Sequence, residues 1–410
     1  MQDQSDHVLV VGAGVIGLSV ALAAQARGLS VRVIERAGPA AGASAGNAGA
    51  FAFSDILPLA APRILRQAPF WLADPLGPLS IPPAYALKIA PWLWRFWKAS
   101  FPGQVAASTQ ALIALMRHSQ ATLSPFLARE GLSHMVRRKG QLQLYEGARE
   151  YRASLPGWQL RAENGIAFEP VEGAAIAEIQ PGIAPRFTHG VWTPDWHSVT
   201  DPKAYTLALA AQFLARGGEL VQQEALALRP DGVQTSAGLL KGRVVLAAGA
   251  WSHHLARGLG LRIPLETERG YNTTLPADAF DLRTQLTFSG HGFVISALDS
   301  GLRVGGAVEL GGLDLPPNMR RAEAMLQKAR AFLPGLRTEG GTQWMGFRPS
   351  LPDSLPAIGP VRGHPGVICA FGHGHLGLTQ STATAEIVAD LLTGRAPPLD
   401  LRPFAPERFQ

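Results

Sequence analysis

Cysteine is almost absent from this chain of 410 residues, which contains Cys369 and no other. A single thiol excludes an intramolecular disulfide and any metal site built from several cysteines, so we expect no metal. Cys369 lies within an apolar run, and we expect it to be a buried core residue. The scarcity of cysteine fits a reducing compartment, and we expect a cytoplasmic protein.

Long runs of one charge and long apolar runs are missing as well. Basic residues outnumber acidic ones by 37 to 31, which gives a formal net charge of +6, but they form no block that indicates nucleic-acid binding. No stretch offers about 18 uninterrupted apolar residues, so no transmembrane helix is predicted. The polar and acidic start, MQDQSDH, does not have the pattern of a signal peptide.

The segment with most affinity for a membrane is residues 85–101, YALKIAPWLWRFWKASF. It is rich in aromatic residues, and Lys88, Arg95 and Lys98 are interspersed among them. One interpretation is a buried helix that is broken at Pro91. The other is an interfacial patch that lies on a bilayer, which keeps open a peripheral contact with the inner face of the cytoplasmic membrane.

The sequence does contain a strand, a glycine turn and a helix near its start. Residues 8–11 form an apolar run, residues 18–27 favour a helix, and residues 31–34 are apolar again, which predicts a βαβ unit with a parallel sheet. Residues 38–49 are nearly all Gly, Ala, Ser and Asn and indicate a loop.

The glycine turn has the spacing G-x-G-x-x-G that binds dinucleotides. Gly12 permits the tight turn, Gly14 lets the backbone approach a pyrophosphate, and Gly17 lets the helix pack closely on the strand. The helix N-terminus adds free N–H groups and a partial positive charge. Glu35, at the end of the second strand, is placed to accept both ribose hydroxyls and disfavours a 2′-phosphate, so FAD and NAD remain.

The loop GASAGNAGAF, residues 42–51, favours FAD. A long loop of small residues can lie flat along an extended cofactor, and Ser44, Asn47 and Ala48 are its plausible contacts. No second G-x-G-x-x-G follows a strand and opens a helix, so the chain has no evident site for NAD(P)H. Electrons would then come from a small substrate and leave to oxygen, a quinone or a carrier.

The rest of the chain predicts a discontinuous arrangement. Residues 200–218 favour a helix capped by Thr200 or Asp201, residues 270–308 hold short antiparallel runs, and residues 366–394 repeat the order strand, glycine turn, helix. We therefore predict an α/β (α+β) fold with a Rossmann-like FAD-binding domain of residues 1–60, 190–255 and 345–410. An interleaved antiparallel-sheet substrate domain would comprise residues 61–189 and 256–344.

Nearly the whole chain resembles the FAD-dependent enzymes that oxidise amino acids, the group of D-amino acid oxidase, glycine oxidase and sarcosine oxidase. The resemblance is carried by the N-terminal glycine motif and by VLAAGAWS, RGYNTTL, MGFRPSLPDSLPAIGP and GHGHLGLTQS. It is strongest to the bacterial D-amino acid dehydrogenases and their D-hydroxyproline-type relatives, in which a loop like residues 46–49 runs beside the flavin.

The resemblance implies non-covalent FAD, because Cys369 does not resemble the attachment cysteine of sarcosine oxidases. The helix that starts near residue 377 would direct its dipole at the flavin and stabilise the anionic reduced ring. The expected cofactor contacts are Gly12, Gly14, Val15, Ile16, Gly17, Glu35, Arg36, Ser44, Asn47, Ala48, Gly49, Ala248, Gly249, Trp251, Gly372, Gly374, Leu376, Gly377, Leu378 and Thr379.

The resemblance also implies a substrate site around Arg348, which matches the family arginine that binds the substrate carboxylate. A guanidinium can hold a planar carboxylate at two points, which agrees with this role. The alternative is a surface arginine paired with Asp353. Tyr271 is expected as a second carboxylate contact.

Histidines are further candidates for the site. His373 and His375 lie in the turn that would hold the flavin, and either could bond the substrate amine or the flavin. The alternative is a structural role for at least one of them. His197 is a further candidate in the pocket, whereas His253 and His254 look like residues at the start of a helix.

The function that follows is FAD-dependent oxidative deamination of a D-amino acid, or of a D-imino acid such as proline or hydroxyproline. A neutral amine can pass its Cα hydride to flavin N5 without a general base, and electrons would go to a quinone, a carrier or O₂. Alternatives are a glycine- or sarcosine-type oxidase, an L-proline-type dehydrogenase, a flavin-binding assembly subunit without turnover, and an NAD-dependent dehydrogenase.

Overall fold

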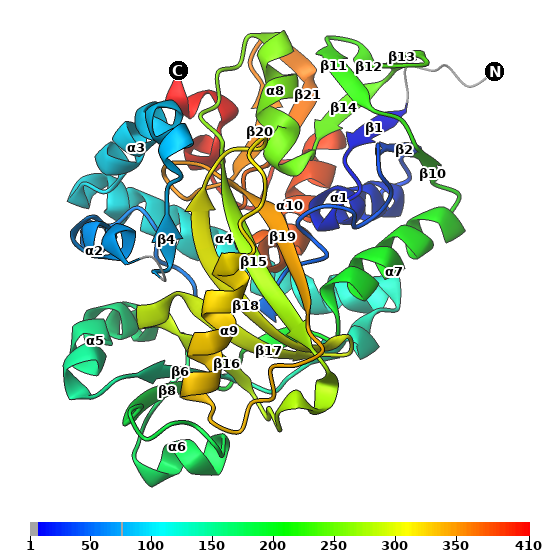
Figure 1. Ribbon diagram of the computed structural model, residues 1–410. Coiled ribbons are helices and arrows are strands. Elements are labelled where there is room, and N and C mark those ends of the chain that lie inside the picture. Colours follow the sequence, from blue (N-terminus) through cyan, green and yellow to red (C-terminus); the bar gives the residue numbers. More distant parts are fainter. Residues whose placement is uncertain (1–6, 75–76) are drawn as a thin grey trace.

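The structure is a computed structural model that describes residues 7–74 and 77–410. Its first large sheet has the strand order β10-β2-β1-β14-β21-β20 (Figure 1). Neighbours run parallel except for β20 and β21. The strands are β1 (Val8–Val11), β2 (Val31–Ile34), β10 (Glu219–Val221), β14 (Arg243–Leu246), β20 (Ala357–Val361) and β21 (His364–Phe371).

These bounds confirm the βαβ unit that the sequence predicts at the start of the chain. Both of its strands coincide with the predicted apolar runs, and the helix between them starts at Val15, earlier than expected. Cys369 lies in β21 and is fully buried, as predicted, and burial raises the pKa of its thiol.

Four helices pack around this sheet and share one hydrophobic core. They are α1 (Val15–Ala26), α4 (Pro102–Glu130), α7 (Pro202–Ala215) and α10 (Gly377–Leu392). Helix α7 begins with Asp201 as its N-cap, whose Oδ1 accepts a hydrogen bond of 2.8 Å from the amide of Ala204. Of the two predicted caps, the structure selects Asp201.

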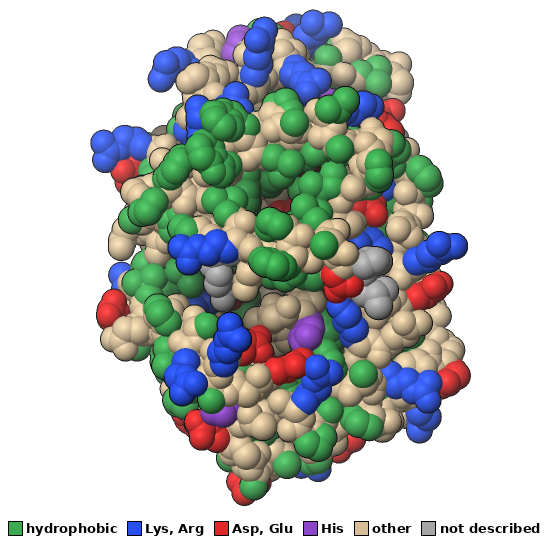
Figure 2. All heavy atoms as spheres, turned by 60° about the vertical axis from the view of Figure 1, so that its left-hand side comes forward, with side chains coloured by type: hydrophobic (Ala, Val, Ile, Leu, Met, Phe, Trp, Pro, Cys, Tyr) green, Lys and Arg blue, Asp and Glu red, His purple; other side chains and the backbone are tan. Residues whose placement is uncertain are grey.

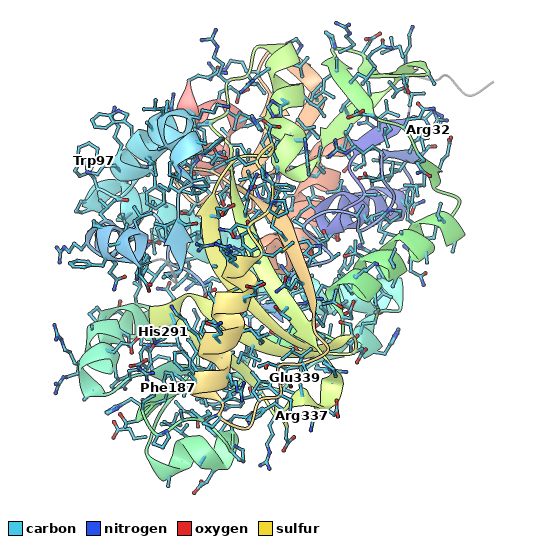
Figure 3. All side chains as sticks on the ribbon, viewed as in Figure 1. Arg32, Trp97, Phe187, His291, Arg337 and Glu339 are labelled. Carbon is cyan, nitrogen blue, oxygen red and sulfur yellow. The ribbon has the colours of Figure 1, made fainter. Side chains whose placement is uncertain are left out.

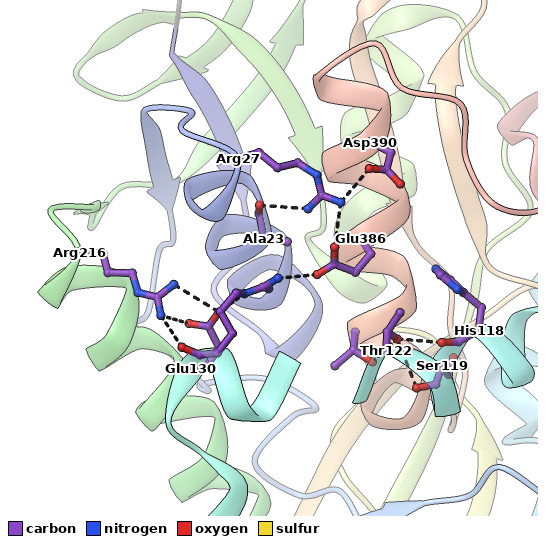
Figure 4. Close-up of polar contacts among 11 residues, drawn as sticks. Ala23, Arg27, His118, Ser119, Thr122, Glu130, Arg216, Glu386 and Asp390 are labelled. Atoms are coloured by element: carbon purple, nitrogen blue, oxygen red, sulfur yellow. Dashed lines mark hydrogen bonds and ion pairs between the residues drawn. The ribbon is translucent and has the colours of Figure 1, made fainter. Parts of the chain in front are cut away.

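Ion pairs join these helices where their ends meet (Figure 4). The guanidinium of Arg27 lies 2.8 Å from Glu386 and 2.7 Å from Asp390, which ties α1 to α10. Arg216, just after α7, lies 2.9 Å from Glu130, the last residue of α4, whose side chain is fully buried. Because a buried carboxylate needs a partner, these pairs hold α1 against α10 and the end of α4 against the end of α7.

The second large sheet is mostly antiparallel and has the order β19-β15-β18-β17-β16-β6-β8-β7, with β4 beside β18. Helix α9 (Arg320–Phe332) covers it over a separate hydrophobic core. The strands are β4 (Leu79–Ser80), β6 (Gln141–Tyr145), β7 (Glu169–Glu172), β8 (His189–Thr193), β15 (Glu266–Leu275), β16 (Gln285–Phe288), β17 (Phe293–Leu298), β18 (Gly301–Leu310) and β19 (Thr342–Ser350).

Two small sheets and five further helices complete the description. The small sheets are β11 (Ala225–Arg229), β12 (Gly232–Thr235) and β13 (Gly238–Lys241), and β3 (Ala50–Phe51), β5 (Val136–Arg137) and β9 (His197–Val199). The helices are α2 (Pro62–Ala73), α3 (Ala86–Ala99), α5 (Ala148–Glu163), α6 (Ala174–Ile179) and α8 (Ser252–Ala256).

The predicted domain boundaries need correction. Residue 190 falls inside β8 and residue 345 inside β19, and both strands belong to the second sheet. Helix α4, which was expected in the substrate domain, packs against α10 in the core of the first sheet. The antiparallel sheet therefore extends further along the chain than its composition indicates.

The expected buried helix with a break at Pro91 is also wrong. Helix α3 continues through Pro91, and Leu87 and Trp94 are 91% and 55% exposed. Helix α3 is therefore apolar on its inner face and on part of its outer face. Among the helices of the described residues, none has the length and apolar character needed to cross a bilayer.

Candidate active site

A cavity of about 1450 Å³ extends between the two large sheets. It is larger than the roughly 300–1,000 Å³ that is usual for small-ligand sites, so it has room for an extended cofactor and a small substrate. One end is lined by the glycine turn after β1, the middle by the loop after β2 and the turn before α10, and a further part by β15, β18 and β19.

The glycines of the first turn are required by their surroundings. Gly12 has φ +110°, and a Cβ there would lie 2.5 Å from the carbonyl oxygen of Ala247. A Cβ on Gly17 would lie 1.9 Å from the oxygen of Gly12, so close packing of helix on strand excludes any side chain. Gly14 and its neighbours line the cavity, which gives a ligand access to the N-terminus of α1.

Glu35 directly follows β2, and its carboxylate lies at this turn. Its Oε2 and Oε1 accept hydrogen bonds of 3.0 Å each from the backbone amides of Ala13 and Ala37. The carboxylate is thereby fixed while it lines the cavity and keeps lone pairs for further donors. This is the geometry that binding of ribose hydroxyls requires.

Other contacts close this end of the cavity. The hydroxyl of Ser44 accepts a hydrogen bond of 2.9 Å from the amide of Val15, in the first turn of α1. The guanidinium of Arg36 lies over the ring of Trp251, 4.4 Å from its centroid. The sequence predicts Ser44, Arg36 and Trp251 as cofactor contacts.

The loop after β2 is attached to the second sheet by residues that the sequence reasoning missed. Arg303 on β18 donates to the carbonyl oxygens of Ala45 (3.1 Å) and Asn47 (2.6 Å). The side-chain amide of Asn272 on β15 donates a hydrogen bond of 3.1 Å to the carbonyl oxygen of Gly46. No signal in the sequence links positions so far apart, because only the packing of the two sheets brings them together.

Within the loop, Asn47 has a local role as well. Its Oδ1 accepts a hydrogen bond of 2.8 Å from the amide of Gly49, which closes a tight turn. Gly46 leaves space for the ring of Trp344, since a Cβ there would lie 2.0 Å from it. Asn47 and Ala48 line the cavity and remain available to a ligand through their backbone.

The turn before α10 is also held against the second sheet. Gly372 and Gly374 have φ of +87° and +55°. The amide of Gly374 donates 2.8 Å to the oxygen of Pro349 on β19. The turn, the start of α10 and β19 therefore form one wall of the cavity.

The two histidines of this turn have different surroundings. His373 is 5% exposed, its Nε2 lies 3.0 Å from Oγ1 of Thr384, and burial lowers its pKa to about 3. It is therefore neutral, and it also lines the cavity. His375 is half-exposed, lines the cavity, and has its Nε2 4.0 Å from Oδ2 of Asp55. Of the two, His375 is the one with a ring available to a ligand.

Arg348 projects from β19 into the cavity over Gly270, where a Cβ would lie 2.3 Å from its Nη2. Its Nη1 donates 3.0 Å to the carbonyl oxygen of Ala307, and its Nη2 lies 3.4 Å from that of Gly306. Burial lowers its pKa, and the nearby Glu268 opposes that shift. It forms no salt bridge with any residue that the structure describes.

The alternative pairing of Arg348 with Asp353 is wrong. Asp353 instead binds Arg408, with 2.7 Å between Nε and Oδ2. Arg348 is thus a partly buried cation whose hydrogen-bond partners are carbonyl oxygens. Such a group attracts an anion from the cavity, because a buried charge without a partner is costly.

Two other predicted site residues have partners of their own within the protein. The hydroxyl of Tyr271 donates 2.9 Å to Glu309 and accepts from the amide of Asn318, on the opposite face of β15 from Arg348. Tyr271 nevertheless lines the cavity, so its role as a carboxylate contact stays a prediction. His197 packs against Phe53 and does not line the cavity, so its predicted place in the pocket is wrong.

Glu268 is a cavity residue that the sequence reasoning missed. It is 6% exposed, pairs in register with Arg348 and lines the cavity. An acidic residue inside the segment ETERGY was the available signal. Most of the predicted cofactor contacts also line the cavity; Gly17, Gly49 and Thr379 do not. His253 and His254 lie in the short helix α8, as expected.

Comparisons with known proteins agree with this geometry. Residues 7–391 match the model of a family described as FAD dependent oxidoreductase. A protein of Bradyrhizobium diazoefficiens named D-amino-acid oxidase is 34% identical over 98% of this chain and 99% of its own length. A D-amino acid dehydrogenase of Rhizobium johnstonii is 29% identical over 98% of this chain and 99% of its own.

The fold itself matches solved structures. The crystal structure of glycine oxidase from Geobacillus kaustophilus superposes with a TM-score of 0.78 at 22% identity. The match covers 99% of this chain and 100% of that one. At this level of identity the likeness concerns the fold.

Proposed function

Because the chain belongs to the FAD-dependent oxidoreductase family, we propose that it oxidises the Cα–N bond of a D-amino acid. A D-imino acid such as proline or hydroxyproline belongs to the same proposal, as does transfer of the electrons to a quinone or another acceptor. The observation that carries the proposal is Arg348, a partly buried cation without a carboxylate partner among the described residues, in the wall of the cavity.

The residues present fit FAD. The glycine turn, Glu35 and Ser44 would hold the ADP half, and the turn from Gly372 to Leu378 would hold the flavin half. We propose non-covalent binding, because Cys369 is buried within β21 and no cysteine occurs among the described residues that line the cavity. When bound, FAD supplies a two-electron acceptor for the hydride that leaves Cα.

Arg348 would orient the substrate. Its guanidinium is anchored by the oxygens of Ala307 and Gly306, so its remaining donors are directed into the cavity. A two-point hold on the substrate carboxylate fixes the direction of the Cα–H bond, and fixed orientation accounts for much of the catalysis in such reactions. His373 is neutral, with its Nε2 next to Thr384, because burial lowers its pKa.

The test is anaerobic mixing of the purified holoenzyme with D- and L-amino acids and imino acids. Bleaching of the flavin absorbance by D-substrates alone is the expected result, and lactate, which lacks the amine, is the matched control. If no amine that carries a carboxylate bleaches the flavin, the proposal fails. Bleaching by L-proline or by glycine and sarcosine would assign the enzyme to those substrates instead.

An oxidase is the second candidate, because one of the relatives is named D-amino-acid oxidase. Air readmitted to the bleached enzyme separates the two. Slow return of the colour with O₂ and fast return with a quinone analogue supports a dehydrogenase, whereas fast return with O₂ supports an oxidase.

A further inference from the structure

The outward side of α3 carries large apolar side chains that the packing of the protein does not require. Ile89 and Trp92 face inward and contact Leu310 in a small core cluster. Leu87 and Trp97 lie on the other side, 91% and 40% exposed. Figure 3 shows Trp97 directed away from the body of the protein.

Aromatic side chains at the outer side of α3 contact one another, and further exposed apolar residues lie on α2. The rings of Trp94 and Trp97 stack with centroids 4.8 Å apart, and Phe101 meets Trp97 edge-on at 4.7 Å. We call this surface the α2–α3 face; its members are Phe70, Leu72, Leu87, Trp94, Trp97 and Phe101, all of them exposed. Exposed apolar patches of this kind mark interaction sites.

The charged residues within α2 and α3 are all basic. Arg66, Lys88, Arg95 and Lys98 are exposed on the same two helices. The sequence has no Asp or Glu from residue 75 to residue 129, and Asp74 lies 3.8 Å from Lys328. A surface that combines Trp, Phe and Leu with Lys and Arg is complementary to an anionic lipid bilayer.

The cavity reaches the same face. Its lining includes Leu65, Trp71 and Leu72 of α2 and Leu93 and Phe96 of α3. Figure 2, in which the side of α2 and α3 comes forward, shows hydrophobic side chains gathered around a hollow. The lining contributed by α2 and α3 is almost entirely apolar, unlike the part near Arg348.

We propose that the α2–α3 face docks on an anionic lipid bilayer, so that a quinone dissolved in the lipid reaches the cavity between α2 and α3. The inference rests on the proposed function, which supplies the electrons. Oxidation of the Cα–N bond to an imine releases two electrons and two protons. The quinone takes up both, and its two carbonyl oxygens become the hydroxyls of a quinol.

Docking is tested by flotation of the holoenzyme with vesicles of equal parts phosphatidylcholine and phosphatidylglycerol. The wild type is expected to float with these vesicles and to bind vesicles of pure phosphatidylcholine at least about tenfold more weakly. The double variant Trp94→Glu/Trp97→Glu should bind the anionic vesicles at least about tenfold more weakly than the wild type. Leu214→Glu, at a residue that is 47% exposed on α7, is the matched control and should float like the wild type.

Flotation uses no substrate, so its failure is distinct from failure of the proposed function. Equal binding of the wild type and the double variant, or no flotation of either, overturns docking. A soluble dimer that this variant dissociates, without lipid binding, assigns the face to a second copy and also overturns it. If the double variant does not fold, Leu87→Glu replaces it.

The route of the quinone is tested separately. The double variant should reduce the soluble dye dichlorophenolindophenol as fast as the wild type does, because its substitutions lie outside the substrate site. It should reduce a long-tailed quinone held in anionic vesicles at least about tenfold more slowly. An equal loss of rate with both acceptors, or no loss with either, overturns delivery through this face.

Discussion

Arg348 is a partly buried positive charge with carbonyl oxygens as its protein partners. Removal of a buried charged partner costs about 2–4 kcal/mol, so Arg348→Ala should lower kcat/KM for every carboxylate substrate by about 30- to 700-fold. Arg348→Lys, which keeps the charge but loses the two-point hold, should have a kcat/KM between those of Arg348→Ala and the wild type.

Steady-state kinetics and substrate titration of the anaerobic enzyme measure this effect. The exposed Arg362→Ala serves as the control for loss of a guanidinium. Unchanged saturation behaviour in Arg348→Ala would remove this residue from the substrate site.

His373 gives a prediction about pH. Burial lowers its pKa from 6.5 to about 3, so the unfolded chain binds more protons than the folded one between these values. Its contribution to stability is complete above pH 6.5 and is lost as the pH falls through this window. His373→Gln, which can keep the bond to Thr384, should reduce the loss of unfolding free energy between pH 7 and pH 5.

Urea unfolding at the two pH values measures the difference. His253, whose pKa burial lowers to about 4, contributes to the same slope, so His373→Gln should reduce the slope without abolishing it. The exposed His134→Gln controls for loss of an imidazole. A slope equal to that of the wild type in His373→Gln would contradict the prediction.

At the scale of elements, the packing of α1 on β1 depends on Gly17. A methyl group there would lie 1.9 Å from the oxygen of Gly12, and neither backbone can move without opening the glycine turn. Gly17→Ala should therefore lower the free energy of unfolding by about 1–3 kcal/mol. It should also weaken FAD binding, because the turn that would hold the pyrophosphate is displaced.

Urea unfolding and titration of the apoprotein with FAD test both effects. Gly103→Ala, in α4 with no atom near the added methyl group, is the matched control and should leave both quantities unchanged. Normal FAD affinity together with reduced stability in Gly17→Ala would separate the turn from the cofactor.

Elements were predicted best where a short apolar run or a capping residue defines the segment locally. The strands at residues 8–11 and 31–34 and the Asp201 cap follow from local composition. Strand β15 is different, because nearly all of its residues are buried on both faces. No alternation then shows which side chains face the cavity, and this is why Glu268 was not predicted.

At the scale of the whole molecule, Arg303 connects the two sheets across the cavity. It is buried on β18 and donates to the carbonyl oxygens of Ala45 and Asn47 in the loop that follows β2. Loss of hydrogen bonds from a charged donor costs about 1.5–3 kcal/mol. Arg303→Ala should thus loosen this loop and weaken FAD binding by about tenfold or more.

Titration of the apoprotein with FAD measures the change, and limited proteolysis of the loop gives a second readout. Arg283→Ala, at an arginine whose side chain is 53% exposed, is the control. FAD affinity equal to that of the wild type in Arg303→Ala would show that the loop holds its position without the second sheet.

The sequence by itself determined the cofactor end of the site. Gly12, Gly17 and Glu35 were predictable because a turn with positive φ, a close approach of helix and strand, and an acid at the end of a strand are local requirements. Only the tertiary structure decided which distant residues complete the cavity and the surface beside it. Arg303, Glu268 and the outer face of α3 depend on which distant strands and helices pack together, and that packing leaves no local pattern in the sequence.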